Sequence, residues 1–191
     1  KVVMDSLRLA LPKFKVKTGD SNLVFAYRMD MNAFDAVNPG EFSFLGEGRI
    51  GKDDLIYFTR MGGEGTRDVT AVMAQRLPSL PSVLQVKADG NLESLCVDTL
   101  YFEVPDLLTV EGDAQLFDLT SDLSLQACVK AFDAHGALVD VDGSFAMGTE
   151  TYAAQVLIDS LVVNHYVALS DTALFTGDVA VQGTGLDFFM P

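Results

Sequence analysis

The sequence has no tryptophan, two cysteines and only 13 Lys or Arg residues, against 27 Asp or Glu, so its formal net charge is −14. Nucleic-acid binding depends on basic residues that neutralise phosphate, and this balance argues against such a partner. The spacing of Cys96 and Cys128 fits neither a disulfide framework nor a metal site. Two free thiols are favoured, and a single bridge between them stays open.

Long apolar runs are also missing. No stretch approaches the roughly 20 apolar residues of a membrane span. The chain does not start with a basic segment followed by an apolar one, as a secretion signal does. We therefore expect that any anchor or targeting signal lies outside this sequence. Hydrophobic residues make up 49% of the chain, which excludes a disordered protein.

The pattern that is present has a period of two. Within residues 123–131 every second residue is apolar, which is typical of a strand with one buried and one wet face. The same alternation occurs at 23–29, 108–116, 139–147 and 175–181, and turn-forming residues such as those at 18–22, 89–91 and 135–136 stand between such segments. The sequence therefore predicts an all-β, mainly antiparallel fold.

One helix is predicted over residues 68–77, where Val69, Val72 and Met73 share a face and Pro78 follows. Because Pro78 and Pro81 lack donors for a central strand, we interpret residues 77–81 as an extended connector. Residues 1–76 would then be an N-terminal strand group ending in the helix, and residues 77–191 a second strand group. The two groups could also form one continuous domain.

A short phrase recurs at 42–46, 108–112, 139–143 and 179–183, in which two alternate apolar residues are followed in phase by Gly. A missing side chain on the apolar face allows a sheet to curve. We therefore expect an elongated, curled sheet of stacked hairpins that encloses a groove, like a folded taco, with one short helix.

No motif for catalysis, nucleotide binding or metal binding stands out. Residues 140–143, Asp-Val-Asp-Gly, match half of a calcium loop, but Asp140 and Asp142 alternate with apolar residues, so we interpret them as solvated carboxylates on a strand. We expect a protein that is not an enzyme, with no catalytic residues, no metal and no cofactor.

Three segments carry a family resemblance: Leu-Pro-Ser-Leu-Pro at 77–81, the stretch 84–92 that ends in Gly-Asn-Leu, and 179–187 with its Gly-Thr-Gly-Leu-Asp ending. This phrasing resembles the TamB and AsmA-like proteins of Gram-negative envelopes, especially the Bacteroidetes type. The resemblance covers a little over half of the chain. It departs from the usual ending, because Phe188-Phe189-Met190 precede Pro191.

The resemblance implies a periplasmic fragment of a bridge-like protein that is anchored in the inner membrane by a segment outside this sequence. Its apolar groove would carry phospholipid between the inner and outer membranes, with acyl chains as the ligand. The alternatives are a scaffold for the assembly of outer-membrane β-barrel proteins, which would then be partners, and a β-sandwich adhesin or carbohydrate-binding module.

The candidate groove residues are apolar and lie in phase within three neighbouring predicted strands. We expect them to share one concave face that holds acyl chains. A closed sandwich core is the alternative use of the same face. The candidates are Leu123, Leu125, Val129, Val139, Val141, Phe145, Val179 and Val181.

Overall fold

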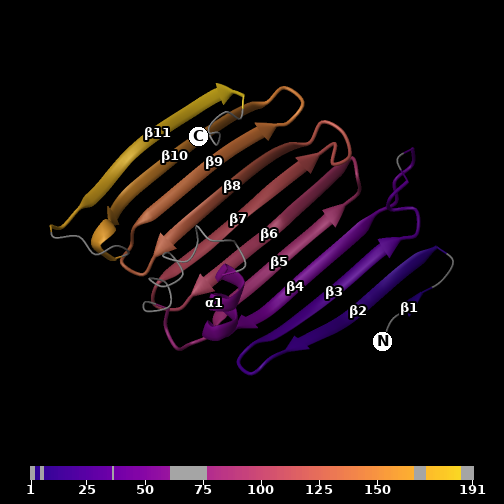
Figure 1. The fold of residues 1–191 in the computed structure, drawn as a ribbon, viewed down its shortest axis with the longest axis horizontal. Coiled ribbons are helices and arrows are strands. Elements are labelled where there is room, and N and C mark those ends of the chain that lie inside the picture. The colour runs from indigo at the N-terminus through magenta and orange to yellow at the C-terminus, as the bar shows by residue number, and fades with distance from the viewer. Residues whose placement is uncertain (1–2, 5–6, 36, 61–76, 166–170, 186–191) are drawn as a thin grey trace.

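The computed structural model describes residues 3–4, 7–35, 37–60, 77–165 and 171–185 (Figure 1). Its strands and helices follow one another as β1 (Val3–Met4), β2 (Arg8–Lys17), β3 (Asn22–Asp30), β4 (Phe42–Ile50), α1 (Lys52–Arg60), β5 (Ser82–Gly90), β6 (Ser94–Val104), β7 (Leu108–Phe117), β8 (Ser124–Asp133), β9 (Leu138–Ala146), β10 (Thr151–Val162), a 3₁₀ helix (Val163–His165) and β11 (Leu174–Thr184).

All strands form one eleven-stranded sheet in which the spatial order equals the chain order (Figure 1). Every neighbouring pair is antiparallel, including β4 and β5, so strands from residues 1–76 and from 77–191 join directly in the same sheet. The predicted all-β fold of stacked hairpins is confirmed. Residues 77–81 contain no strand, as expected for a connector with two prolines.

The strand register keeps one face of the sheet apolar from end to end. Residues directly opposite each other on paired strands have their side chains on the same face. A single row of such partners crosses the sheet from β2 to β11 and contains only apolar residues and glycine: Phe14, Phe25, Gly46, Val86, Leu100, Gly112, Val129, Val141, Val156 and Val179. We call the face that carries this row the apolar face.

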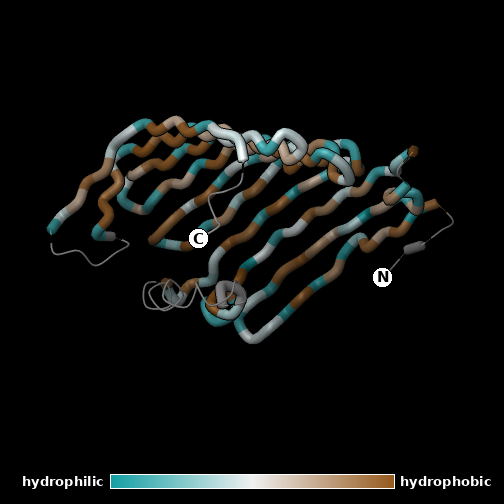
Figure 2. The backbone as a smooth tube through the Cα atoms, turned by 45° about the horizontal axis from the view of Figure 1, so that its top comes forward, coloured by the Kyte–Doolittle hydropathy of each residue, from teal (hydrophilic) through white to brown (hydrophobic). Residues whose placement is uncertain are grey.

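The next row, on the opposite face, is mostly polar. It comprises Lys15, Val24, Glu47, Gln85, Tyr101, Glu111, Lys130, Asp140, Leu157 and Asp178. We call this side the polar face. Figure 2 shows the resulting alternation of hydrophobic and hydrophilic residues along the strands.

Three bulges preserve this separation where the sequence breaks its alternation. Leu11 and Phe14 in β2 are three residues apart, yet they oppose Tyr27 and Phe25, which are two apart. The extra residue returns Phe14 to the apolar face. Similar register shifts precede Leu100 in β6 and Leu161 in β10, and within the last of these Ser160 takes a positive φ of 56°.

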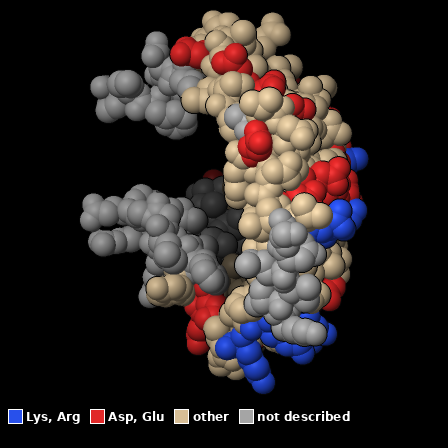
Figure 3. Space-filling model, turned by 90° about the vertical axis from the view of Figure 1, so that its right-hand side faces the viewer, with Lys and Arg blue, Asp and Glu red and all other residues tan. Residues whose placement is uncertain are grey.

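The sheet curls into an open, C-shaped wall (Figure 3). Charged side chains gather on its convex side in this view, which the register identifies as the polar face, so the apolar face is concave. The buried apolar residues of the described chain lie in turns or near strand ends: Ala33, Ile50, Leu77, Val104 and Ala137. No second sheet covers the concave face in the part of the chain that the structure describes.

Helix α1 begins directly after β4 and is held by the β2–β3 turn. The hydroxyls of Thr18 and Ser21 donate hydrogen bonds to the Asp54 carboxylate, and Ser21 Oγ also accepts the Gly51 N–H at 2.8 Å. These bonds, Ser21 first, lower the pKa of Asp54. Acidic residues also suit the first turn of a helix because its free N–H groups carry partial positive charge.

The sequence did not predict α1. The helix that it did predict, over 68–77, falls outside the described residues except for Leu77, which lies in a bend. Lys52, the first residue of α1, donates a hydrogen bond from its Nζ to the Leu77 carbonyl at 2.8 Å and so connects α1 with the start of the connector.

Two glycines on the apolar face provide a matched stability test. A Cβ on Gly112 would overlap the Cys128 carbonyl oxygen and lie 3.1 Å from the Val129 Cα, whereas a Cβ on Gly143 would meet nothing closer than 3.9 Å. We expect Gly112→Ala to lower the free energy of unfolding by about 1–3 kcal/mol through overpacking. Gly143→Ala should change it by less than about 1 kcal/mol, towards higher stability. Urea unfolding followed by circular dichroism measures both, and equal effects would contradict this account of Gly112.

Candidate functional site

The concave apolar face is the feature most suited to binding. All of the predicted groove residues except Leu123 lie in strands, and the register brings them onto this face: Leu125 and Val129 in β8, Val139, Val141 and Phe145 in β9, and Val179 and Val181 in β11. Leu123 immediately precedes β8, and its carbonyl accepts the Met147 N–H at 2.8 Å.

The sequence predicted that these residues lie on three neighbouring strands. In the structure β10 separates β9 from β11. It contributes Tyr152, Ala154, Val156 and Ile158 to the same face, and none of these was proposed from the sequence. Their alternation was obscured by Ala153 and Leu157, which are apolar but lie on the polar face. The register was needed to assign them.

The apolar face also extends well beyond β8–β11. Strands β2 to β7 add residues such as Leu23, Phe25, Leu84, Phe102 and Leu116 in the same phase. With strands about 4.8 Å apart and about 3.3 Å per residue, the face from β2 to β11 measures about 43 by 33 Å. The footprint is therefore about 1,400 Å². Only part of this area is exposed to water, because most of the side chains on it are partly buried.

The side chains of the apolar face are only half-buried. No described large side chain anywhere in the chain is fully buried, and Val179 and Val181 in the last strand are 44% and 47% exposed. A packed sandwich interior would instead contain residues almost fully removed from water. Among the described residues, no second sheet completes such an interior over this face.

Aromatic rings cover two of the glycines on this face. The Tyr152 side chain lies over Gly183, where a Cβ would overlap its hydroxyl, and Phe25 lies 3.1 Å from the position of a Cβ on Gly46. Phe25 also stacks on Phe44, with ring centroids 5.7 Å apart. The recurring glycines thus lie in phase with the apolar residues, as expected, and they leave room for neighbouring rings.

The polar face carries cross-strand ion pairs in place of apolar contacts. Lys87 pairs with Asp98, and Lys130 Nζ lies 3.3 Å from Asp140 Oδ2. Both lysine pKa values are raised, first by the hydrogen bond to the carboxylate and then by its charge. A depression of about 730 Å³ on this side runs over β7–β11 between side chains such as Gln115, Gln126, Asp142, Gln155 and Gln182.

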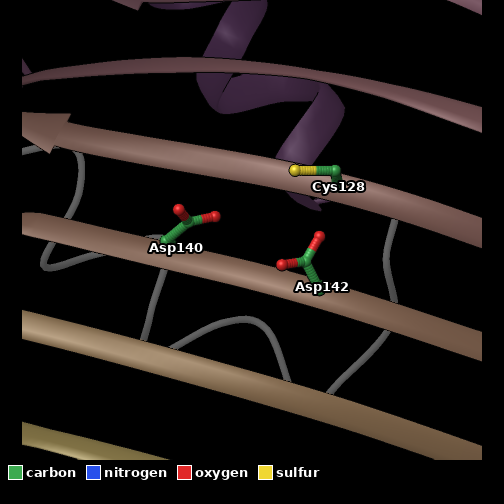
Figure 4. Close-up of side chains that lie close together, drawn as sticks. All are labelled: Cys128, Asp140 and Asp142. Carbon is green, nitrogen blue, oxygen red and sulfur yellow. The ribbon is translucent and has the colours of Figure 1, made fainter.

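In the part of the chain that the structure describes, one cluster of possible metal ligands is found, and it lies on the polar face. Cys128 on β8 and Asp140 and Asp142 on β9 bring ligand atoms within 4.8 Å of one another (Figure 4). Lys130 neutralises Asp140, although Asp140 Oδ1 is shielded from water without a hydrogen-bond partner. Metal ions prefer the thiolate of cysteine. The Asp142 carboxylate raises the pKa of the Cys128 thiol, first through a hydrogen bond, and thereby keeps it protonated.

The two cysteines are free, as favoured from the sequence. Both lie on the polar face with β7 between their strands, since Cys96 opposes Gln115 while Cys128 opposes Asp113. The pKa of Cys96 is raised as well, first by its hydrogen bond to Asp98 at 3.1 Å. Neither thiol is activated for nucleophilic chemistry, and the expectation of a non-catalytic protein stays a prediction.

Comparison of the chain with protein-family models, with curated proteins and with solved structures found no significant match. Among the described helices, none has the length and apolar character needed to cross a membrane.

The hydrogen bond between Cys128 and Asp142 leads to a prediction about thiol reactivity. Because a raised pKa reduces the thiolate fraction at neutral pH, Cys128 should react slowly with iodoacetamide. Asp142→Asn removes the negative charge, so the alkylation rate should rise and the pH midpoint of its profile should fall. The measurement is alkylation against pH in a Cys96→Ser background, with Asp159→Asn as the control. Unchanged profiles in Asp142→Asn would contradict the assigned partner.

Proposed function

We propose that the concave apolar face binds the acyl chains of phospholipids, and that this chain is a non-catalytic, lipid-carrying segment of a bridge-like protein in the Gram-negative envelope. The observation that carries the proposal is the unbroken apolar row from β2 to β11 on a concave face that no described sheet covers.

The size of this face favours an occupant. Apolar surface left in water is unfavourable at about 25 cal/mol per Å², so an apolar ligand that covers the exposed part of this face is stabilised. Flexible acyl chains can follow a curved surface lined by Val, Leu, Phe and Gly, and each buried CH₂ contributes about 0.8 kcal/mol.

The chemistry of the face also agrees with an acyl ligand. The central row that crosses the sheet has no polar side chain. Acyl chains need no hydrogen-bond partner, whereas a sugar or a nucleotide would need several. On a C-shaped wall, the lipid head groups can remain in water at the open side while the chains lie along the concave surface (Figure 3).

The cellular setting of the proposal comes from the resemblance to TamB and AsmA-like proteins. A curled sheet that adds strands in chain order suits a bridge, because its groove runs across the strands and grows with every hairpin. In this setting the segment lies in the periplasm, and phospholipid moves along the groove between the inner and outer membranes.

A charge placed in the middle of the face tests lipid binding. Val141 is flanked by Val129 and Val156 on neighbouring strands, and we expect Val141→Asp to weaken phospholipid binding at least tenfold. Because water reaches this open face, the variant should keep its fold, with a loss well below the several kcal/mol of a buried unpaired carboxylate. Native mass spectrometry with a phospholipid gives the bound fraction, and thermal melting gives the stability.

The matched control is Leu45→Asp, which introduces the same charge on the polar face at a residue that is 45% exposed. It should leave lipid binding unchanged. The proposal fails if the parent protein binds no phospholipid, or if both variants reduce binding equally. Collapse of the fold in Val141→Asp alone would mean that the face is a closed core.

A further inference from the structure

The two edges of the sheet differ in their readiness to pair with another strand. At one edge, the described residues of β1 pair with Leu9 and Ala10 of β2. The rest of β2 contains Pro12 at a bulge and Lys13, Lys15 and Lys17. Proline, bulges and lysines are the features by which natural proteins prevent edge-to-edge association. This edge is therefore protected against pairing.

The other edge has none of these protections. No described strand pairs with the outer side of β11, which is eleven residues long and contains no proline, lysine or arginine. Its only charged residue is Asp178, and most of its residues are exposed. An exposed edge strand of this length presents a row of unpaired N–H and C=O groups.

The sequence of β11 is almost the same in both directions. Residues 176–184 read Thr-Gly-Asp-Val-Ala-Val-Gln-Gly-Thr, which is symmetric about Ala180 except that Asp178 corresponds to Gln182. Two copies of this strand, placed antiparallel about a two-fold axis at Ala180, would bring Val179 opposite Val181, Gly177 opposite Gly183 and Thr176 opposite Thr184. Every pair then joins residues of equal or compatible type on one face.

We propose that β11 is a self-complementary pairing edge, through which a second copy of this chain adds to the sheet as a symmetric dimer. The two-fold axis lies perpendicular to the sheet at Ala180, as an isologous interface requires. Because opposite residues share a face, the apolar faces of both copies lie on the same side. The exposed Val179 and Val181 each gain a valine neighbour from the partner copy.

Electrostatics are compatible with this register, although the chain has no Lys or Arg after Lys130. Asp178 of one copy lies opposite Gln182 of the other, whose amide can donate to it. The two Asp178 side chains are four residues apart along the strand direction, which is about 13 Å and exceeds the Debye length of about 8 Å at physiological salt. Pairing through β2 would instead meet the lysines and Pro12.

The test places charge on the two-fold axis. Ala180 is exposed on the polar face, so Ala180→Lys puts two lysines directly opposite each other in the dimer but leaves the monomer surface unstrained. Sedimentation velocity of the full chain should show a dimer of twice 20.6 kDa for the parent protein, and a dissociation constant at least about tenfold higher for Ala180→Lys. Mixing Ala180→Lys with Ala180→Glu should restore a dimer that contains one copy of each.

Ala153→Lys is the matched control, because Ala153 is exposed on the same face but lies in β10, away from the edge. It should dimerise like the parent. In a Cys96→Ser/Cys128→Ser background, Ala180→Cys should form an intermolecular disulfide under mild oxidation, and Ala153→Cys should not. A parent protein that stays monomeric, an equal effect of Ala153→Lys, or no rescue on mixing would each overturn the proposal. None of these measurements involves lipid, so they are independent of the proposed acyl-binding function.

Discussion

The structure depends on one constraint, which is that the two-residue alternation stays in phase across every strand pairing. Successive side chains of a strand point to opposite faces, so a slip of one residue would move the whole apolar set of that strand to the polar face. In a single-layer sheet no second layer could compensate for such a slip. The unbroken row from Phe14 in β2 to Val179 in β11 shows that the phase is kept over the full width of the sheet.

Alternation alone predicted much of the fold. The residues around Val129 and Val141 were assigned correctly to one face because polar residues such as Gln126 and Asp142 separate them. The predicted turns at 18–22, 89–91 and 135–136 lie at the ends of the neighbouring strands, although Asn22, Asp89 and Gly90 still belong to β3 and β5. The glycines at 46, 112, 143 and 183 were also placed correctly on the apolar face, because they continue the same period.

Other features arise from interactions that no local pattern records. A bulge cannot be distinguished from the end of a strand in the sequence, so the return of Phe14, Leu100 and Leu161 to their phase needed the register. Helix α1 is only nine residues long and depends on contacts between Asp54 and the β2–β3 turn. The meeting of Cys128 with Asp142 likewise depends on how β8 and β9 pair.

The strict order of the strands has a consequence for how such a sheet can change in length. Each described strand pairs only with its neighbours in the chain, so the sheet is a linear array whose stability is approximately a sum of terms between adjacent strands. Removing a hairpin of two strands leaves the direction of all later strands unchanged, and their neighbours can pair again. Removing a single strand would reverse the direction needed by every strand after it. The hairpin is therefore the unit in which the sheet can be duplicated or deleted, and the reach of its concave surface can be adjusted in steps of about 10 Å.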